Sequence, residues 1–121
     1  MTSVEGPEKR QRGGLELGRK QRLASLISYQ PGSVVSRTII DQGAGTVTLF
    51  GFDKGEGLSE HSTPYDALVE VLEGVALVTV SGVSNEMGEG EAIILPAGAP
   101  HSIRGTEKFK MLLTMIRERR P

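Results

Sequence analysis

The chain has two histidines, His61 and His101, and they are its best candidates for chemistry near neutral pH. An imidazole acts there as a general acid or base, or as a ligand of a divalent metal. The sequence has no cysteine, which excludes disulfides, thiolate metal sites and cysteine nucleophiles. A mononuclear metal usually takes three or four ligands from histidine and carboxylate. Two imidazoles therefore predict at most an incomplete metal site.

The elements that must position the two histidines have the composition of short strands joined by tight turns. The chain of 121 residues is long enough for one domain, and its 16 glycines, 6 prolines and lack of tryptophan favour the all-β class. Runs rich in β-branched and aromatic residues alternate with turn signals. We expect strands at residues 34–40, 46–52, 67–72, 75–80, 92–95, 102–104 and 109–116, with turns at 53–57 and 81–85.

Two of the expected strands are apolar on more than one face. In residues 109–116 the alternating sets of side chains are both largely apolar, and the strand at 34–40 carries Val34, Val35, Ile39 and Ile40. A barrel of this size cannot cover all of these side chains by itself. The sequence therefore predicts a homodimer.

The N-terminal part of the chain differs from the rest. Residues 1–22 are polar and charged and predict a flexible tail, whereas residues 23–121 predict the barrel domain. Leu23, Leu26 and Ile27 share one helical face, so a short N-terminal helix is expected over residues 21–29. The basic residues of the tail fit either a solvated arm or contact with an acidic partner.

Charge and hydropathy exclude several classes of partner. The 14 basic and 15 acidic residues nearly cancel, so no overall field attracts nucleic acid or an anionic membrane. No run of 18 apolar residues is present, and the N-terminus does not combine a basic start with an apolar stretch. We therefore expect a cytosolic (cytoplasmic) protein that binds neither nucleic acid nor membranes.

The two histidine-bearing stretches resemble the two sequence motifs of the cupins. The first motif is glycine, five residues, His-x-His, a glutamate and a final glycine, and Gly55, His61 and Gly74 match it. Thr63 and Ala67 stand where the second histidine and the glutamate belong. The second motif is matched at Gly90, Pro96, Gly98 and His101, and Gly105 replaces its terminal asparagine. The resemblance covers about residues 33–116.

This resemblance implies a double-stranded β-helix, or jelly-roll, barrel whose mouth holds the site. His61 and Thr63 would share a strand face toward the mouth, and His101 would approach from across the barrel. His61, Thr63, Tyr65 and His101 are the expected ligand-binding residues. Tyr65 fits either a lid over the mouth or simple packing at its rim.

No carboxylate completes the metal site in a regular strand. Glu70 lies three residues from Ala67 and therefore faces the other side of the sheet, and Glu60 and Asp66 each adjoin an inward position. No cofactor is required by the sequence. A divalent metal (Mn, Fe, Ni or Zn) would be bound weakly by His61 and His101.

Three functions are consistent with the sequence. The first is a module that binds or senses a small polar metabolite in a pocket around the two histidines, which then form a degenerate metal site. The alternative is a metal-dependent cupin enzyme, such as an isomerase, lyase or dioxygenase, because a fold does not fix a function. The third is a purely structural or partner-binding role, for which the basic tail is the candidate contact, while the histidines only hydrogen-bond each other, Thr63 or the backbone.

Overall fold

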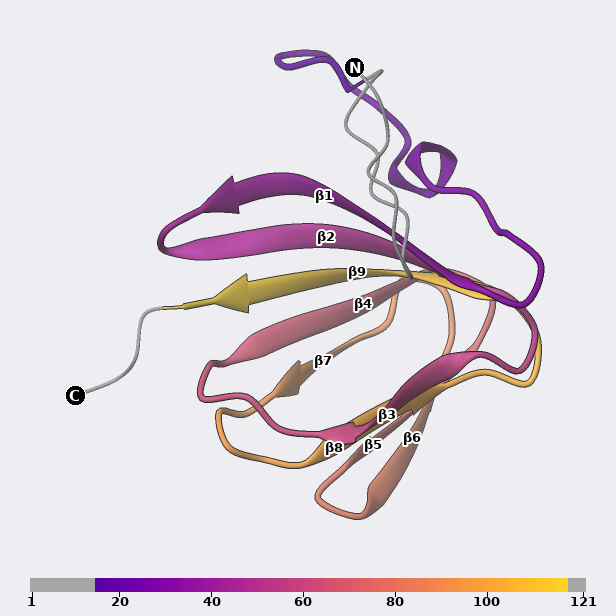
Figure 1. The fold of residues 1–121 in the computed structure, drawn as a ribbon, viewed down its shortest axis with the longest axis vertical. Helices are drawn as coiled ribbons and strands as arrows, with labels where there is room; N and C mark the ends of the chain where they lie inside the picture. Colours follow the sequence, from indigo (N-terminus) through magenta and orange to yellow (C-terminus); the bar gives the residue numbers. More distant parts are fainter. Residues whose placement is uncertain (1–14, 118–121) are drawn as a thin grey trace.

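The structure, a computed structural model, describes residues 15–117 (Figure 1). Within this range the chain forms one 3-10 turn and nine strands. In chain order the elements are η1 (Leu23–Leu26), β1 (Val34–Gln42), β2 (Gly45–Phe52), β3 (Gly57–His61), β4 (Ala67–Glu73), β5 (Ala76–Val80), β6 (Val83–Met87), β7 (Ala92–Leu95), β8 (His101–Arg104) and β9 (Phe109–Ile116).

The strands form two antiparallel sheets that face each other. One sheet has five strands in the order β1-β2-β9-β4-β7, and the other has four in the order β3-β8-β5-β6 (Figure 1). Strands from distant parts of the chain are neighbours in both sheets, as in a jelly-roll barrel. The prediction of an all-β double-stranded β-helix is confirmed.

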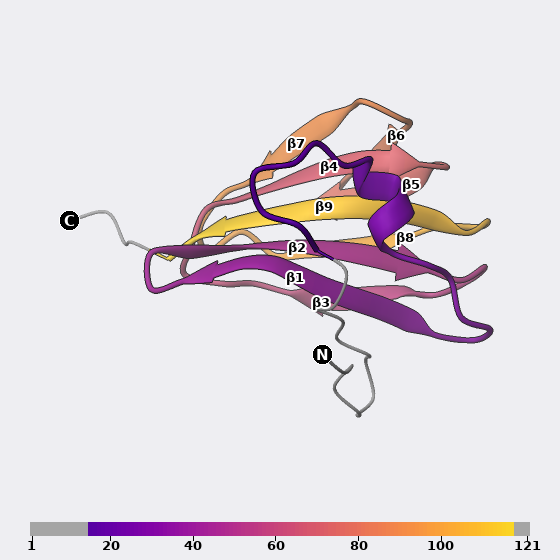
Figure 2. The same ribbon diagram turned by 90° about the horizontal axis from the view of Figure 1, so that it is seen from above.

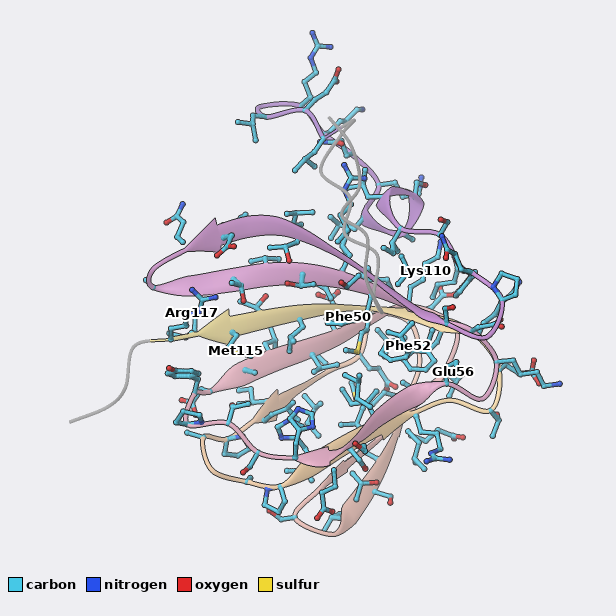
Figure 3. The ribbon with its side chains drawn as sticks, viewed as in Figure 1. Phe50, Phe52, Glu56, Lys110, Met115 and Arg117 are labelled. Carbon is cyan, nitrogen blue, oxygen red and sulfur yellow. The ribbon has the colours of Figure 1, made fainter. Side chains whose placement is uncertain are left out.

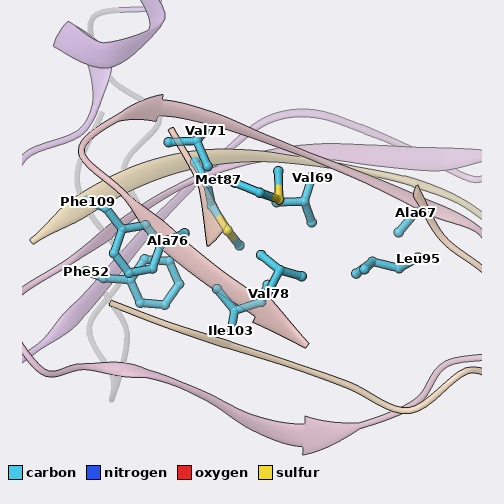
Figure 4. Close-up of a cluster of buried hydrophobic side chains, with 11 residues drawn as sticks. Phe52, Ala67, Val69, Val71, Ala76, Val78, Met87, Leu95, Ile103 and Phe109 are labelled. Carbon is cyan, nitrogen blue, oxygen red and sulfur yellow. The ribbon is translucent and has the colours of Figure 1, made fainter. Parts of the chain in front are cut away.

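The core lies between the two sheets because alternate side chains of each strand point inward. In β4 the inward set includes Val69 and Val71, both fully buried, whereas Leu68 on the other face is exposed. Figure 4 shows the cluster that these residues form with side chains of both sheets.

The two ends of the barrel differ in how they are filled. At the end where β2 stops and β9 begins, the rings of Phe52 and Phe109 stack with centroids 4.3 Å apart, and both are fully buried. We call this the closed end. At the other end, where the sheets diverge in Figure 1, β9 carries the half-buried Met115 and β3 and β8 carry the two histidines. We call this the open end.

Gly105 makes room for the aromatic stack at the closed end. A Cβ atom on this residue would lie 2.5 Å from Cδ1 of Phe109 and 2.8 Å from the carbonyl oxygen of Glu107. Any larger side chain would displace the ring or the backbone. The position where the cupin motif has asparagine is therefore occupied by a glycine that lies against the closed-end core.

The hairpin between β5 and β6 corrects one sequence prediction. Residues 81–85 were expected to form a turn, but only Ser81 and Gly82 do, and Val83 already belongs to β6. Ser81 and Gly82 have φ angles of 48° and 82°. Two successive positive φ angles are typical of a two-residue hairpin turn, which leaves the following residues in register with β5.

The prediction of a short N-terminal helix over residues 21–29 is also wrong, because only a 3-10 turn forms, at Leu23–Leu26. The residue before it, Arg22, makes no side-chain cap, and Ile27 is already extended and buried. The first turn of a helix fixes several residues for few hydrogen bonds, so a short helix forms only where packing supports it. Here packing on the sheet favours an extended chain after the turn. The turn and the residues after it lie across the outer face of the five-stranded sheet (Figure 2).

We call residues 23–30 the strap, and two buried cations of the sheet fasten it. Arg37 donates from Nη1 to the carbonyl oxygen of Leu26 at 3.0 Å, and Lys110 donates from Nζ to that of Ala24 at 2.6 Å. In Figure 3 the Lys110 side chain lies between the sheet and the strap. Hydrogen bonds from charged donors are stronger than neutral ones, so the strap is held by more than apolar contact.

A third polar contact joins the strap to β4. The hydroxyl of Tyr29 donates to Glu73 at 2.6 Å, and Lys110 lies 3.9 Å from the same carboxylate. Burial and the neighbouring Glu73 raise the pKa of Tyr29, so its hydroxyl remains a donor. The strap therefore covers the closed-end half of the sheet, where Val35, Leu49 and Leu112 pack against it.

The strap covers some of the apolar side chains on which the homodimer prediction rests. Part of the outer apolar surface of β1 and β9 is covered by the chain itself rather than by a second copy. Residues 1–14 of the expected tail lie outside the described residues. The homodimer itself stays a prediction.

Candidate functional site

His61 and His101 are neighbours on adjacent strands of the four-stranded sheet. They are register partners in the antiparallel pair of β3 and β8, and their ring centroids are 4.4 Å apart with the ring planes at 67°. His101 was expected to approach from across the barrel. The structure instead brings the two together within one sheet, through a strand pairing that alternation along a single strand does not reveal.

Both histidines lie on the inward face of this sheet. Ile103, two residues after His101, belongs to the core, so alternation puts His101 on the same face. Residues directly opposite in a strand pair share a face, which gives His61 the same orientation. Leu58 also packs against the core, although it is three residues from His61 and strict alternation would put the two on opposite faces. The register shift between Leu58 and His61 allows both side chains to point inward.

The two rings differ in burial. His101 is in β8, between β3 and β5, and is only 6% exposed, whereas His61 is exposed on β3, at the edge of the sheet. Desolvation lowers the pKa of His101, the hydrogen bond to Ala99 opposes this shift, and the nearby His61 adds to it. His101 is therefore neutral at physiological pH.

Each ring is oriented by a backbone carbonyl two residues earlier in the chain. Nδ1 of His61 lies 2.8 Å from the oxygen of Ser59, and Nδ1 of His101 lies 3.0 Å from that of Ala99. A carbonyl oxygen only accepts hydrogen bonds, so each neutral ring carries its proton on Nδ1. In residues 15–117 neither Nε2 atom has a protein hydrogen-bond partner. Both Nε2 atoms are thus available as acceptors or as metal ligands.

Thr63 does not follow the expected alternation, because β3 ends at His61. Its hydroxyl donates to the carbonyl oxygen of Tyr65 at 3.1 Å and accepts from the Tyr65 amide at 3.4 Å. The Thr63 side chain thus closes a local turn. Tyr65 itself is half-buried in the same loop.

The loop at residues 62–66 is fastened to the loop that precedes His101. The amide of Gly98 donates to the carbonyl oxygen of Thr63 at 2.7 Å, and the amide of Ala97 donates to Oδ1 of Asp66 at 2.8 Å. The sequence predicts Asp66 to be a rim or turn residue rather than a metal ligand, but it does not predict this contact. No local sequence signal indicates this contact, because Asp66 and Ala97 are 31 residues apart in the chain.

The donor set around the histidines does not make a complete metal site. In the part of the chain that the structure describes, no group of three or more His, Cys, Asp or Glu side chains is placed to hold a metal ion. Glu70 aligns with Leu112 and Ala92 on the outer face of the sheet, in agreement with the alternation argument. Two imidazoles supply only about half of the side-chain ligands that a mononuclear metal site usually has.

Comparison with known proteins agrees with this architecture. A family model described as a cupin domain matches residues 48–116, more than half of the chain. The chain belongs to the cupin family. No curated protein matches it. Within residues 15–117, no helix is long and apolar enough to cross a membrane.

Several solved structures are similar to this cupin. A conserved protein of unknown function from Streptococcus pyogenes is 30% identical with a TM-score of 0.82, and the match covers 89% of this chain and 95% of that one. A cupin superfamily protein from Desulfitobacterium hafniense is also 30% identical, with a TM-score of 0.81 and coverage of 86% and 95%. A cupin 2 conserved barrel domain protein from Leptotrichia buccalis is 39% identical, with a TM-score of 0.74, over 78% of this chain and 46% of that one.

Proposed function

We propose that this cupin binds or senses a small polar metabolite at the open end of its barrel, through His61 and His101. The observation that carries the proposal is the pair of Nε2 atoms, which have no protein partner among the described residues. The Nε2 atom of His101 is not among the buried unpaired polar atoms of residues 15–117, so a ligand can reach it although the rest of the ring is buried. A ligand that donates hydrogen bonds would satisfy both rings.

The chemistry of the rings defines the class of ligand. Two neutral Nε2 atoms on rings 4.4 Å apart accept hydrogen bonds from adjacent donors, such as neighbouring hydroxyl or amino groups. The inward surface beside them is apolar, since Val80 is in register with His101 and packs against the core. Apolar walls with a few polar groups are typical of small-molecule sites. Thr63 and Tyr65 would contribute at the rim, through the loop that they stabilise.

A metal-dependent enzyme is the second candidate, and one observation favours it. Metal-bound histidines usually donate their other ring nitrogen to a carbonyl or carboxylate, as both rings do here. A divalent ion would need further ligands from water or substrate, because the described residues supply no third side chain. Elemental analysis of the purified protein after dialysis against a chelator separates the two candidates. Stoichiometric metal that survives this treatment would favour the enzyme.

The binding proposal is tested by a ligand-observed NMR screen of sugars, polyols, carboxylates and amines. Asparagine replaces histidine well in this case, because its amide can keep the hydrogen bond of Nδ1 while removing Nε2. We expect His61→Asn and His101→Asn each to weaken a hit by about tenfold, the value of one hydrogen bond of about 1.4 kcal/mol.

Ser59→Ala is the matched control, since it keeps the carbonyl that orients His61 and removes only an exposed hydroxyl. This variant should bind as the unmodified protein does. Hits that bind both asparagine variants as tightly as the unmodified chain would contradict the proposal.

A further inference from the structure

The hairpin of β1 and β2 carries hydroxyl groups on its inner face, where most of the barrel is apolar. Thr48 is in register with Leu113, which packs against the core, and Thr38 is in register with Thr48. Residues opposite each other in a strand pair share a face, so both threonines point into the barrel. On the outer face the same strands carry Val35 and Leu49, which pack against the strap. We call Thr38 and Thr48 the threonine pair.

The inner face of the five-stranded sheet becomes more accessible toward the open end. On β2 the inward Phe52 is fully buried, whereas Phe50 and Thr48 are only half-buried (Figure 3). On β9 the same change separates the buried Met111 from the half-buried Met115. Solvent therefore reaches the inner face from the open end, as far as the threonine pair.

The threonine pair faces the sheet that carries the histidines. In both Figure 1 and Figure 2, β3 lies opposite β1 and β2 across the barrel interior. His61 is on β3, and His101 is beside it on β8. The open end thus has accessible polar groups on both of its inner walls, one wall with imidazoles and the other with hydroxyls.

The two walls ask for the same chemical group in a ligand. Each neutral imidazole offers only an acceptor at Nε2, so a ligand must donate to it. The Oγ1 atoms of Thr38 and Thr48 are 3.2 Å apart, and one hydroxyl donates to the other. The pair then keeps one free proton and several lone pairs. A ligand hydroxyl can donate to the first wall and can donate or accept at the second, whereas a carboxylate cannot donate at all.

No positive charge on the inner walls attracts an anion. The strands β1–β9 contain three lysine or arginine residues, Arg37, Arg104 and Lys110. Arg37 and Lys110 donate to the strap, and Arg104 is exposed on the outer face of the other sheet. Just beyond β9, Arg117 is paired with Asp41 at 3.8 Å. An anionic ligand would therefore lose its hydration without gaining a countercharge, which is unfavourable.

We propose that the threonine pair is the second half of the ligand site, and that the ligand is an uncharged polyhydroxyl compound. Its hydroxyl groups donate to His61 and His101 at one end and exchange hydrogen bonds with Thr38 and Thr48 at the other. This inference rests on the proposed binding at the two histidines. It adds the class of ligand and two contact residues that lie outside both cupin motifs.

A series of linear polyols tests whether one molecule bridges the two walls. Glycerol, erythritol, xylitol and sorbitol lengthen in that order, and ligand-observed NMR with the full chain measures the binding of each. Affinity should rise with length until the polyol reaches both walls. Gluconate has the length of sorbitol but carries a carboxylate, and it should bind about tenfold more weakly or worse.

Valine variants test the threonine pair itself. Thr38→Val and Thr48→Val keep the shape of the side chain and remove one hydroxyl, so each should weaken sorbitol binding by about three- to tenfold. Glycerol, too short to reach from the histidines to the other wall, should bind these variants unchanged. Thr48→Ser keeps the hydroxyl and should bind sorbitol as the unmodified protein does. Thr79→Val is the matched control, because Thr79 lies 3.0 Å from Ser84 in a similar hydroxyl pair on the outer face of the four-stranded sheet, and its sorbitol binding should be unchanged.

The histidine variants separate this inference from the proposal on which it rests. If His61→Asn and His101→Asn weaken sorbitol binding but the valine variants do not, the threonine subsite is wrong and the histidine site stands. If neither set changes the binding, both are wrong.

Further outcomes decide the remaining cases. If a valine variant fails to fold, the threonine methyl signals of the unmodified chain decide, and those of Thr38 and Thr48 should shift on addition of sorbitol while that of Thr79 does not. No binding of any polyol, tighter binding of gluconate than of sorbitol, or an equal loss in Thr79→Val would each overturn the inference.

Discussion

The closed and open ends of this barrel are built from the same strands but are stabilised very differently. At the closed end Phe52 and Phe109 stack inside the barrel, and the strap covers the outer face through Lys110 and Tyr29. At the open end the inward positions of β3 and β8 hold imidazoles, and the outer face exposes Ile40, Leu68 and Ile94. The closed end is packed on both faces of the five-stranded sheet, whereas the open end is fully packed on neither face.

This difference explains where contacts with other molecules are expected. A packed end whose apolar side chains are buried by the chain itself leaves little surface for a ligand or a partner. The unsatisfied Nε2 atoms and the exposed aliphatic side chains both belong to the open end. Stability and binding are thus assigned to opposite ends of the same fold.

The largest expected effect is a loss of stability at the closed end. Phe109→Ala removes one member of a fully buried stack and should lower the free energy of unfolding by about 3–5 kcal/mol. His101→Asn at the open end should lower it by about 1 kcal/mol or less, since the hydrogen bond to Ala99 can be kept. Urea denaturation followed by circular dichroism measures both. Equal losses at the two ends would break the comparison.

Alternation along a strand is what the sequence predicts best. In residues 67–72 it places Val69 and Val71 inward and correctly turns Glu70 outward. Alternation cannot show that a strand ends at His61, which is why Thr63 was given a strand position that it does not have. Nor can it show which strands are neighbours, so the pairing of His61 with His101 in one sheet was missed.

The strap was missed for a related reason. Leu23, Leu26 and Ile27 share a helical spacing, but packing on the sheet favours one 3-10 turn and an extended chain over a helix. The partners of Arg37 and Lys110 are backbone carbonyls. Backbone acceptors leave no trace in the side-chain sequence, so buried cations of this kind are found only from the structure.

A smaller effect should follow when the strap is loosened. Lys110→Met keeps the length of the side chain but leaves the Ala24 carbonyl without its donor, and it should cost about 1–2 kcal/mol of unfolding free energy. Lys54→Met is the control, because Lys54 is an exposed residue in a 3.9 Å surface ion pair with Glu107. Exposed pairs of that kind contribute little. A control variant as destabilised as Lys110→Met would show that the strap adds nothing.

The smallest effect is a pH dependence that originates at the open end. Burial lowers the pKa of His101 below its usual 6.5, so in acid the unfolded chain binds a proton that the folded chain does not. Stability from this group is complete above pH 6.5 and declines as the pH falls toward the folded-state pKa. Urea midpoints at pH values on both sides of 6.5 should therefore fall more in the unmodified protein than in His101→Asn. Identical pH profiles would show that His101 does not titrate abnormally.

The central claim is that both imidazoles offer an unprotonated Nε2 atom to a shared site at the open end. Long-range ¹⁵N–¹H NMR of protein labelled at histidine reads the protonation of each ring nitrogen directly. When both rings are neutral, the geometry predicts a proton on Nδ1 of His61 and His101 and none on either Nε2, with both Nε2 signals shifting when a screened ligand is added. A proton on Nε2 of either ring, or a bound ligand that leaves both Nε2 signals in place, would contradict the account.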